Sequence, residues 1–166
     1  MIQNLEAISL QSSTPLQLGN QNEQNKSKIR HYCFLVHGLW GDESEMSFIE
    51  TALKDAIRHS PLVNNNELDH PLVEFVIHKT TCNNGNTNDG IANGGARLAQ
   101  EIKTVLESPL RNTLFDQDEN DPNTIKKTIS FVGNSLGGLY ARYAIANLYS
   151  DNTISPRNFN VFCTTG

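Results

Sequence analysis

The chain has 166 residues, a length that corresponds to a single domain large enough for a hydrophobic core. Its 18 acidic and 13 basic residues give a formal net charge of −5, and Lys and Arg form no cluster, so nucleic acid is not an expected partner. The mean hydropathy of −0.43 and the hydrophobic fraction of 37% predict that part of the chain lies outside the packed core.

The sequence also indicates a compartment. No apolar run reaches the roughly 20 residues that a membrane-spanning helix needs, and the N-terminus lacks the features of a signal peptide, so we expect a soluble, cytoplasmic protein. Cys33, Cys82 and Cys163 are an odd number without CxxC spacing, which predicts buried thiols in a reducing compartment. The five histidines supply no metal-site spacing, and neither a metal nor a cofactor is expected.

The first part of the chain divides into a polar arm and a strand. Residues 1–28 are rich in Gln, Asn and Ser without periodicity, which predicts a flexible arm ahead of a domain over 29–166. The apolar run 32–36 is typical of a parallel strand covered on both faces. A turn with the sequence HGLWG, residues 37–41, follows this strand.

A helix and a second strand come next. Asp42 and Glu45 resemble a capping box, which predicts that a helix begins there and ends near residue 60. Apolar residues recur at helical spacing in this segment: Met46, Ile49, Leu53 and Ile57. A second strand is predicted at 73–78.

The second half of the chain continues this alternation. A polar loop at 83–90 leads to a helix over 98–106, and an acidic stretch at 111–127 predicts an exposed insertion before a strand at 128–132. A sharp turn then leads to an apolar helix and to a fourth strand at 159–163. Alternating strands and helices predict an α/β fold with a mostly parallel sheet and flanking helices.

The strongest chemical motif is the pentapeptide Gly133-Asn134-Ser135-Leu136-Gly137, which follows the third strand and opens a helix. This is the G-x-S-x-G nucleophile elbow in its expected context, although a chance match in a glycine-rich loop is the alternative. The glycines leave room for a strained turn that presents the Ser135 hydroxyl group above the sheet. We therefore predict Ser135 as a catalytic nucleophile.

An oxyanion hole is predicted beside this serine. The helix that begins at Leu136 directs free N–H groups toward the space where an oxyanion would develop, and the 37–41 turn stands where hydrolases place the second donor. The backbone N–H groups of Leu39 and Leu136 are the predicted donors. His37 is not expected to be the base, which reaches the serine from a later loop, and the alternative is a structural turn in which His37 bonds to the backbone.

These motifs resemble a eukaryotic family of serine esterases related to lipases. The resemblance rests on the HGLWG turn, the Asn-Asp-Gly-Ile segment at 88–95 and the elbow sequence GNSLGGLYARYA, and it extends over 32–166. It implies an α/β-hydrolase fold and hydrolysis of glycerolipid acyl esters by a monoacylglycerol lipase or phospholipase, in some members at lipid droplets. It also implies Ser135 as the nucleophile and Leu39 and Leu136 as the oxyanion positions.

Three other residues of these motifs have alternative interpretations. We interpret Asp89 as an Asx turn or helix cap before Ile91, with ordering of the active-site rim as the alternative. Arg142 is interpreted as a solvated or structural arginine rather than a phosphate clamp. Trp40 either lines an acyl pocket or packs in the core.

The catalytic partners of the serine are not evident. In this fold the acid and the histidine follow the nucleophile, but no histidine follows His78, and the one later acid, Asp151, is interpreted as a loop residue. We therefore expect a fragment that holds only the N-terminal part of an α/β-hydrolase, with impaired activity and with its last strand as an aggregation-prone edge.

The sequence leaves one main hypothesis for the function, one alternative and one disfavoured class. The main hypothesis is a lipase-like serine hydrolase whose partners are acyl-ester substrates and lipid droplets or membranes that it contacts peripherally. The alternative is a catalytically inactive module that binds a lipid or a protein. A nucleotide-binding protein is disfavoured, because neither G-x-x-x-x-G-K-[ST] nor G-x-G-x-x-G occurs after a strand.

Overall fold

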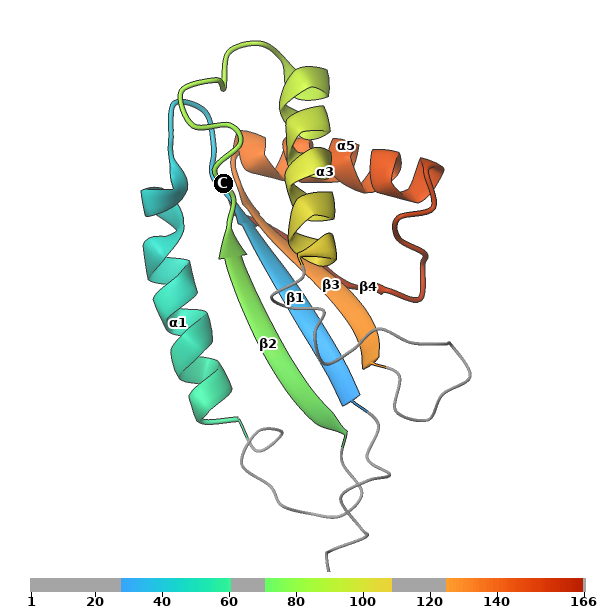
Figure 1. Ribbon diagram of the computed structural model, residues 1–166. Coiled ribbons are helices and arrows are strands. Elements are labelled where there is room, and N and C mark those ends of the chain that lie inside the picture. Colours follow the sequence, from blue (N-terminus) through green and yellow to red (C-terminus); the bar gives the residue numbers. More distant parts are fainter. Residues whose placement is uncertain (1–27, 61–70, 109–124, 166) are drawn as a thin grey trace, which may run out of the picture.

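A computed structural model describes residues 28–60, 71–108 and 125–165 (Figure 1). The predicted flexible arm, apart from residue 28, lies outside the described residues, as does the predicted insertion up to residue 124.

The described chain forms one all-parallel sheet with helices on both of its faces, which confirms the predicted α/β class. The strands have the spatial order β2-β1-β3-β4. The elements in chain order are β1 (Lys28–Val36), the 3-10 helix η2 (Glu43–Met46), α1 (Ser47–Arg58), β2 (Leu72–Lys79), α3 (Ile91–Glu107), β3 (Ile125–Asn134), α5 (Leu136–Ser150) and β4 (Phe159–Thr165). Parallel neighbours need a crossover connection, which explains why strands and helices alternate.

The strands extend beyond their predicted limits, mainly at their amino ends. β3 begins at Ile125, so the last three residues of the predicted 111–127 insertion belong to the sheet, where they pair with Lys28–Arg30 of β1. Likewise, the backbone of Lys28 is already part of β1 rather than of the arm. These segments carry lysine and arginine, which hide the alternating apolar pattern on which strand prediction depends.

The central strand β1 is buried on both faces, as its continuous apolar run predicts. Tyr32, Phe34 and Val36 belong to a core with residues of α3 and α5, and the Phe34 ring stacks on Phe131 with 5.6 Å between the ring centroids. Cys33 and Leu35 point to the opposite face and pack with residues of η2 and α1. Successive side chains of a strand alternate between its faces, so one short segment supplies both cores.

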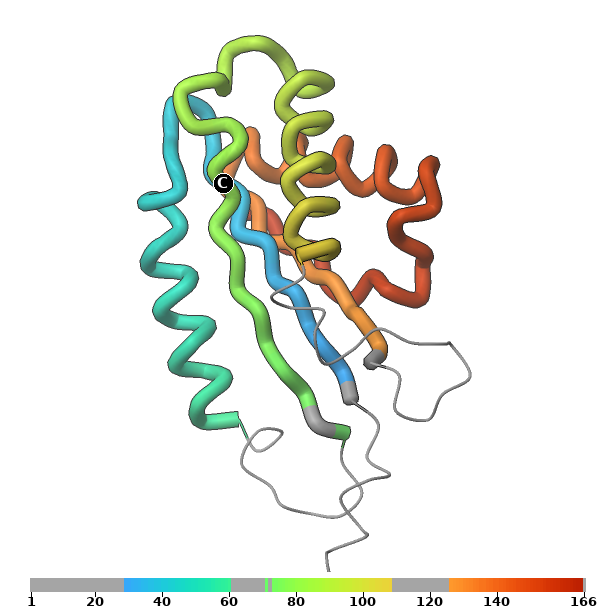
Figure 2. The backbone as a smooth tube through the Cα atoms, in the orientation of Figure 1, coloured from blue at the N-terminus to red at the C-terminus, as the bar shows by residue number. Residues whose placement is uncertain are grey.

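The helix after β1 begins as the sequence predicts. The Asp42 carboxylate accepts a hydrogen bond from the N–H of Ser44 at 2.8 Å and caps η2, which continues into α1. All strands run in the same direction, so the turn after β1, the loop after β2 and the connection from β3 to α5 meet at the carboxyl edge of the sheet (Figure 2). This edge is where open α/β sheets bind their ligands.

Candidate active site

Ser135 connects β3 to α5 in an unusual backbone conformation. Its φ of 50° and ψ of −119° lie outside the regions that L-residues commonly adopt, and its side chain is exposed. A Cβ atom added at Gly137 would lie 2.3 Å from the carbonyl oxygen of Val36, and one added at Gly133 would lie 2.5 Å from the nitrogen of Gly138. Both glycines of the motif are therefore required by sterics, as predicted.

The last described strand, β4, is hydrogen-bonded to this elbow. The N–H of Ser135 donates to the carbonyl oxygen of Thr165 at 2.8 Å, and the N–H of Gly138 donates to the Ser135 carbonyl at 3.1 Å. β4 thus fixes the backbone of the predicted nucleophile directly.

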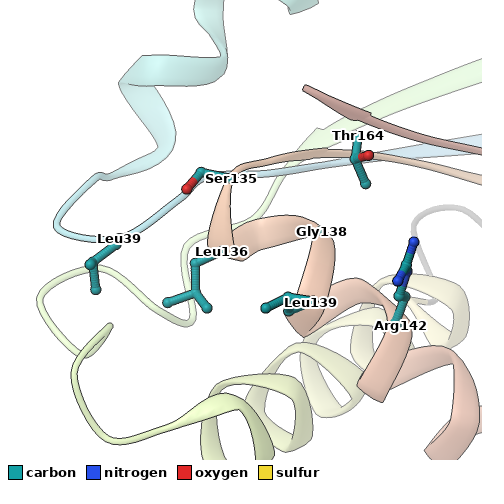
Figure 3. A pocket seen from close by; sticks show the side chains of 7 residues that line it. All are labelled: Leu39, Ser135, Leu136, Gly138, Leu139, Arg142 and Thr164. Carbon is teal, nitrogen blue, oxygen red and sulfur yellow. The ribbon is translucent and has the colours of Figure 1, made fainter. Parts of the chain in front are cut away.

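The structure brings the three predicted site residues together around one open pocket of about 480 Å³ (Figure 3). Ser135 stands at the end of β3, Leu39 on the turn after β1 and Leu136 at the start of α5. The pocket is lined by Leu39, Ser135, Leu136, Gly138, Leu139, Arg142 and Thr164. An apolar wall from three leucines beside a serine hydroxyl suits an acyl group.

The turn after β1 lies against the elbow and is itself strained. A Cβ atom at Gly38 would lie 3.1 Å from the Cβ of Ser135, which shows how closely the two segments approach. The N–H of Gly41 donates to the Gly38 carbonyl at 3.3 Å, and Trp40 has a φ of 60°, which costs an L-residue about 1–2 kcal/mol. The N–H of Trp40 donates to the Thr87 hydroxyl oxygen at 2.9 Å, and such a bond contributes about 1 kcal/mol.

Trp40 differs from both of its predicted roles. Its side chain is 80% exposed and does not line the pocket at Ser135, so it neither packs in the core nor forms an acyl wall there. Its backbone has a φ of 60°, a conformation that a sequence pattern does not reveal. Arg142 is exposed at the pocket wall, and its guanidinium carbon lies 5.5 Å from the centroid of the Phe162 ring, which agrees with the structural interpretation.

His37 is fully buried beneath the site. Its Nδ1 lies 3.1 Å from the Gly38 carbonyl oxygen, so it bonds to the neighbouring backbone, and its burial separates it from the exposed Ser135 side chain. The other histidines in the described part of the chain, His31, His59 and His78, hydrogen-bond to Thr128, Asp55 and Glu101. The described residues therefore bring no histidine into a hydrogen bond with Ser135.

Asp151 is also separated from the nucleophile. It is the C-cap residue of α5, which begins directly after Ser135, so the two lie roughly 20 Å apart along the helix. Its carboxylate pairs with Lys103 and accepts from the Thr153 hydroxyl at 2.6 Å, and these interactions lower its pKa to about 2. Asp151 thus has a structural role at the helix end, in agreement with its interpretation as a loop residue.

The interpretation of Asp89 as a helix cap is wrong. The N-cap residue of α3 is Gly90, and no side chain caps this helix. Asp89 instead forms a two-point ion pair with Arg97, with N–O distances of 2.5 and 2.8 Å, and the hydrogen bonds from Arg97 lower the pKa of Asp89. The partner is two helical turns further along the chain, a separation that a local capping rule does not consider.

Glu101 of α3 forms a second polar centre, which fixes the beginning of the loop between β2 and α3. Glu101 accepts hydrogen bonds from His78 Nε2 at 2.8 Å and from the N–H groups of Thr81 and Cys82, both at 3.0 Å. Burial raises the pKa of this carboxyl, but the hydrogen bonds outweigh burial and bring it to about 2. Neither Glu101 nor Thr87 was identified from the sequence, although the Asn-Asp-Gly-Ile segment marks their neighbourhood.

The cysteines are less uniform than predicted. Cys33 is buried, and burial raises its pKa to about 11, but Cys82 is half-buried and Cys163 is exposed. Cys163 is exposed because β4 lies at an edge of the sheet. All three thiols are free.

The described residues also bear on metal binding and on membrane insertion. No group of three or more His, Cys, Asp or Glu side chains among them could hold a metal ion. None of their helices is both long enough and apolar enough to cross a membrane.

The fold and the site together define a class. A parallel α/β sheet with an exposed serine on a strained strand-to-helix turn, beside a second turn at the same sheet edge, is the arrangement of α/β-hydrolase-like proteins. The family model described as "Putative serine esterase (DUF676)" matches residues 26–164, and the chain belongs to this family. Comparisons with curated proteins and with solved structures found no match.

Proposed function

We propose that this chain forms the nucleophile half of a serine esterase that hydrolyses acyl esters of glycerolipids. The observation that carries the proposal is the position of Ser135, which is exposed on a strained elbow in the same pocket as Leu39 and Leu136. In this mechanism the Ser135 oxygen attacks the ester carbonyl carbon, and the N–H groups of Leu39 and Leu136 stabilise the oxyanion. A base takes the proton of the Ser135 hydroxyl group and returns it to the alcohol, which leaves as its bond to the carbonyl carbon breaks. Water then hydrolyses the acyl-enzyme, which releases the carboxylic acid and regenerates the Ser135 hydroxyl group.

The reaction also requires a base, which we propose comes from outside the described residues. A serine without its base keeps only the contributions of substrate binding and of the oxyanion hole. A state of the protein in which no base reaches Ser135 is therefore expected to have an activity several orders of magnitude below that of a complete triad.

The lining of the pocket supports a lipid ester as the substrate. Leu39, Leu136 and Leu139 offer apolar surface to an acyl chain, whereas Thr164 offers a hydroxyl group to a glycerol head group. Parallel assays with a monoacylglycerol and with a phospholipid distinguish these two substrate classes.

Exposed apolar side chains near the site support contact with a lipid surface. Trp40 on the turn after β1 and Phe48 in the first turn of α1 are 80% and 83% exposed, and both belong to segments at the carboxyl edge of the sheet. We propose that these side chains enter a lipid surface and present Ser135 to it. This proposal includes a cytoplasmic location, with peripheral attachment to lipid droplets or membranes.

Labelling with a fluorophosphonate probe tests the nucleophile. Labelling of the purified chain is expected to disappear in Ser135→Ala and to persist in Ser150→Ala, which removes an exposed serine at the other end of α5. Added imidazole, as an external base, is expected to accelerate labelling at Ser135. Folded wild-type protein that stays unlabelled even with imidazole would contradict the esterase proposal.

A second candidate function is a catalytically inactive binding module. It is favoured by one observation, which is that no described histidine bonds to Ser135. This candidate predicts that Ser135→Ala binds lipid as wild type does and that neither protein is labelled.

Vesicle binding tests the proposed lipid contact. Trp40 is the single tryptophan of the chain, so its fluorescence should shift to the blue when phosphatidylcholine vesicles are added. Phe48→Ala is expected to bind about 30-fold more weakly, because burial of an aromatic side chain contributes about 2 kcal/mol. The matched control is Tyr149→Ala, an exposed aromatic residue at the far end of α5. Equal binding by all three proteins would exclude this contact surface.

A further inference from the structure

Thr87 hydrogen-bonds to both segments that carry the predicted oxyanion donors. Its hydroxyl oxygen accepts from the N–H of Trp40, the residue after Leu39, at 2.9 Å. Its carbonyl oxygen accepts from the Tyr140 hydroxyl group, one turn into the helix that begins at Leu136, also at 2.9 Å. Thr87 is buried and Tyr140 is fully buried, so water competes little for either bond.

The loop that carries Thr87 is held rigidly on α3. The Arg97 side chain donates to the Asn83 side chain at 2.9 Å and to the Asn86 carbonyl at 2.6 Å, besides its ion pair with Asp89. The Asn83 amide in turn donates to the Gly94 carbonyl at 3.2 Å. These contacts fix the loop on both sides of Thr87. Thr87 therefore has a fixed position from which it can hold both the 37–41 turn and α5.

The hydrogen bond from the Trp40 N–H to the Thr87 hydroxyl oxygen holds the Leu39–Trp40 peptide in a strained orientation. The 38–41 turn has its third residue at positive φ, a position that favours glycine, and here it is occupied by Trp40. Rotation of the Leu39–Trp40 peptide would relieve this strain and would disturb the adjacent N–H of Leu39. The Thr87 hydroxyl group opposes that rotation because it accepts the Trp40 N–H.

We propose that Thr87 is a positioning residue, which holds the Leu39 turn and the amino end of α5 in the arrangement that lets both N–H groups reach one oxyanion. This inference rests on the proposed esterase function. Because a positioning residue does not contact the substrate, removal of the Thr87 hydroxyl group should lower kcat and leave KM unchanged.

The test compares Thr87→Val, which removes the hydroxyl group at nearly constant volume, with Thr87→Ser, which retains it. Hydrogen exchange of the Trp40 amide, followed by NMR, should accelerate about tenfold or more in Thr87→Val and stay close to wild type in Thr87→Ser. The rate of fluorophosphonate labelling or of short-chain ester hydrolysis should fall about 10- to 100-fold in Thr87→Val alone. Thr104→Val, which removes an exposed hydroxyl group on α3, is the matched control.

The two readouts separate this inference from the esterase proposal. If wild-type protein shows no reaction at Ser135, the esterase proposal fails, but Trp40 amide exchange still decides whether Thr87 holds the turn. Folded Thr87→Val with wild-type exchange at Trp40, or Thr87→Ser that exchanges as fast as Thr87→Val, would overturn the inference. If Thr87→Val does not fold, Tyr140→Phe tests the other bond, because it removes only the hydroxyl group that holds the Thr87 carbonyl.

Discussion

Ser135 has a backbone conformation that is unfavourable for stability. A non-glycine residue at φ 50° and ψ −119° costs on the order of 1–3 kcal/mol, and it persists because the surroundings impose it. Here the surroundings are the Thr165 carbonyl behind the Ser135 N–H and the close approach of Gly137 to Val36.

Replacement of Ser135 by glycine is therefore expected to stabilise the fold while it abolishes labelling. Glycine adopts positive φ without strain, and after its larger loss of backbone entropy the free energy of unfolding should rise by about 1 kcal/mol. Urea unfolding measures this difference. Ser135→Ala is the control, because alanine keeps the strain; equal stability of the two variants would show that the backbone at this position is not strained.

At the scale of elements, the structure joins β2, the following loop and α3 through Glu101. His78 at the end of β2 donates to this carboxylate, as do the first N–H groups of the loop. A half-buried carboxylate with several donors stabilises the fold only while it is ionised.

Acid should therefore destabilise the contacts that Glu101 makes with β2 and with the loop that follows it. The pKa of Glu101 in the folded chain is about 2, below its ordinary value of 4.5. Its contribution, on the order of 3 kcal/mol, is present above pH 4.5 and is lost as the pH falls from 4.5 toward 2. Glu101→Gln should unfold more easily at pH 7 and should lose less stability over that interval than wild type. Denaturant titrations across this pH range, with the exposed Glu45→Gln as the control, check this; parallel curves for all three proteins would contradict it.

At the scale of the whole molecule, the described sheet ends at β4 on one side. Val161 of β4 is 52% exposed and borders an apolar pocket of about 240 Å³ between α1 and the sheet. In the described part of the chain β4 pairs only with β3, so its other edge offers unpaired backbone groups beside apolar side chains. Such an edge favours pairing between molecules.

A lysine at this edge should reduce self-association. Val161→Lys is expected to weaken association of the chain about tenfold, because a charge at the edge opposes strand pairing and removes apolar surface. Sedimentation measures the degree of self-association. Reducing conditions prevent intermolecular disulfides through the exposed Cys163. Tyr149→Lys adds the same charge elsewhere; an equal effect from that variant would mean that net charge, rather than the edge, controls association.

The fold was largely predictable because its signals are local. A continuous apolar run defines β1, and β-branched and aromatic residues define β3. Helical spacing defines α1 and α3, and the G-x-S-x-G pentapeptide defines the elbow within five adjacent residues. The amino ends of β1 and β3 were missed, since Lys126 and Lys127 pair with β1 through backbone groups that carry no side-chain signal.

The sequence by itself determined the alternating α/β order, the position of Ser135 on a strand-to-helix turn and the presence of a glycine-rich turn after the first strand. Each of these follows from residues close together in the chain, where sterics and periodicity operate directly. Only the tertiary structure decided that Asp89 pairs with Arg97, that Trp40 faces solvent and that Thr87 links the turn to α5. The two Thr87 contacts join residues 47 and 53 positions apart, so they exist only once the sheet has brought the carboxyl ends of its strands to one edge. The Asp89–Arg97 pair spans eight residues, which is farther than a local capping rule reaches.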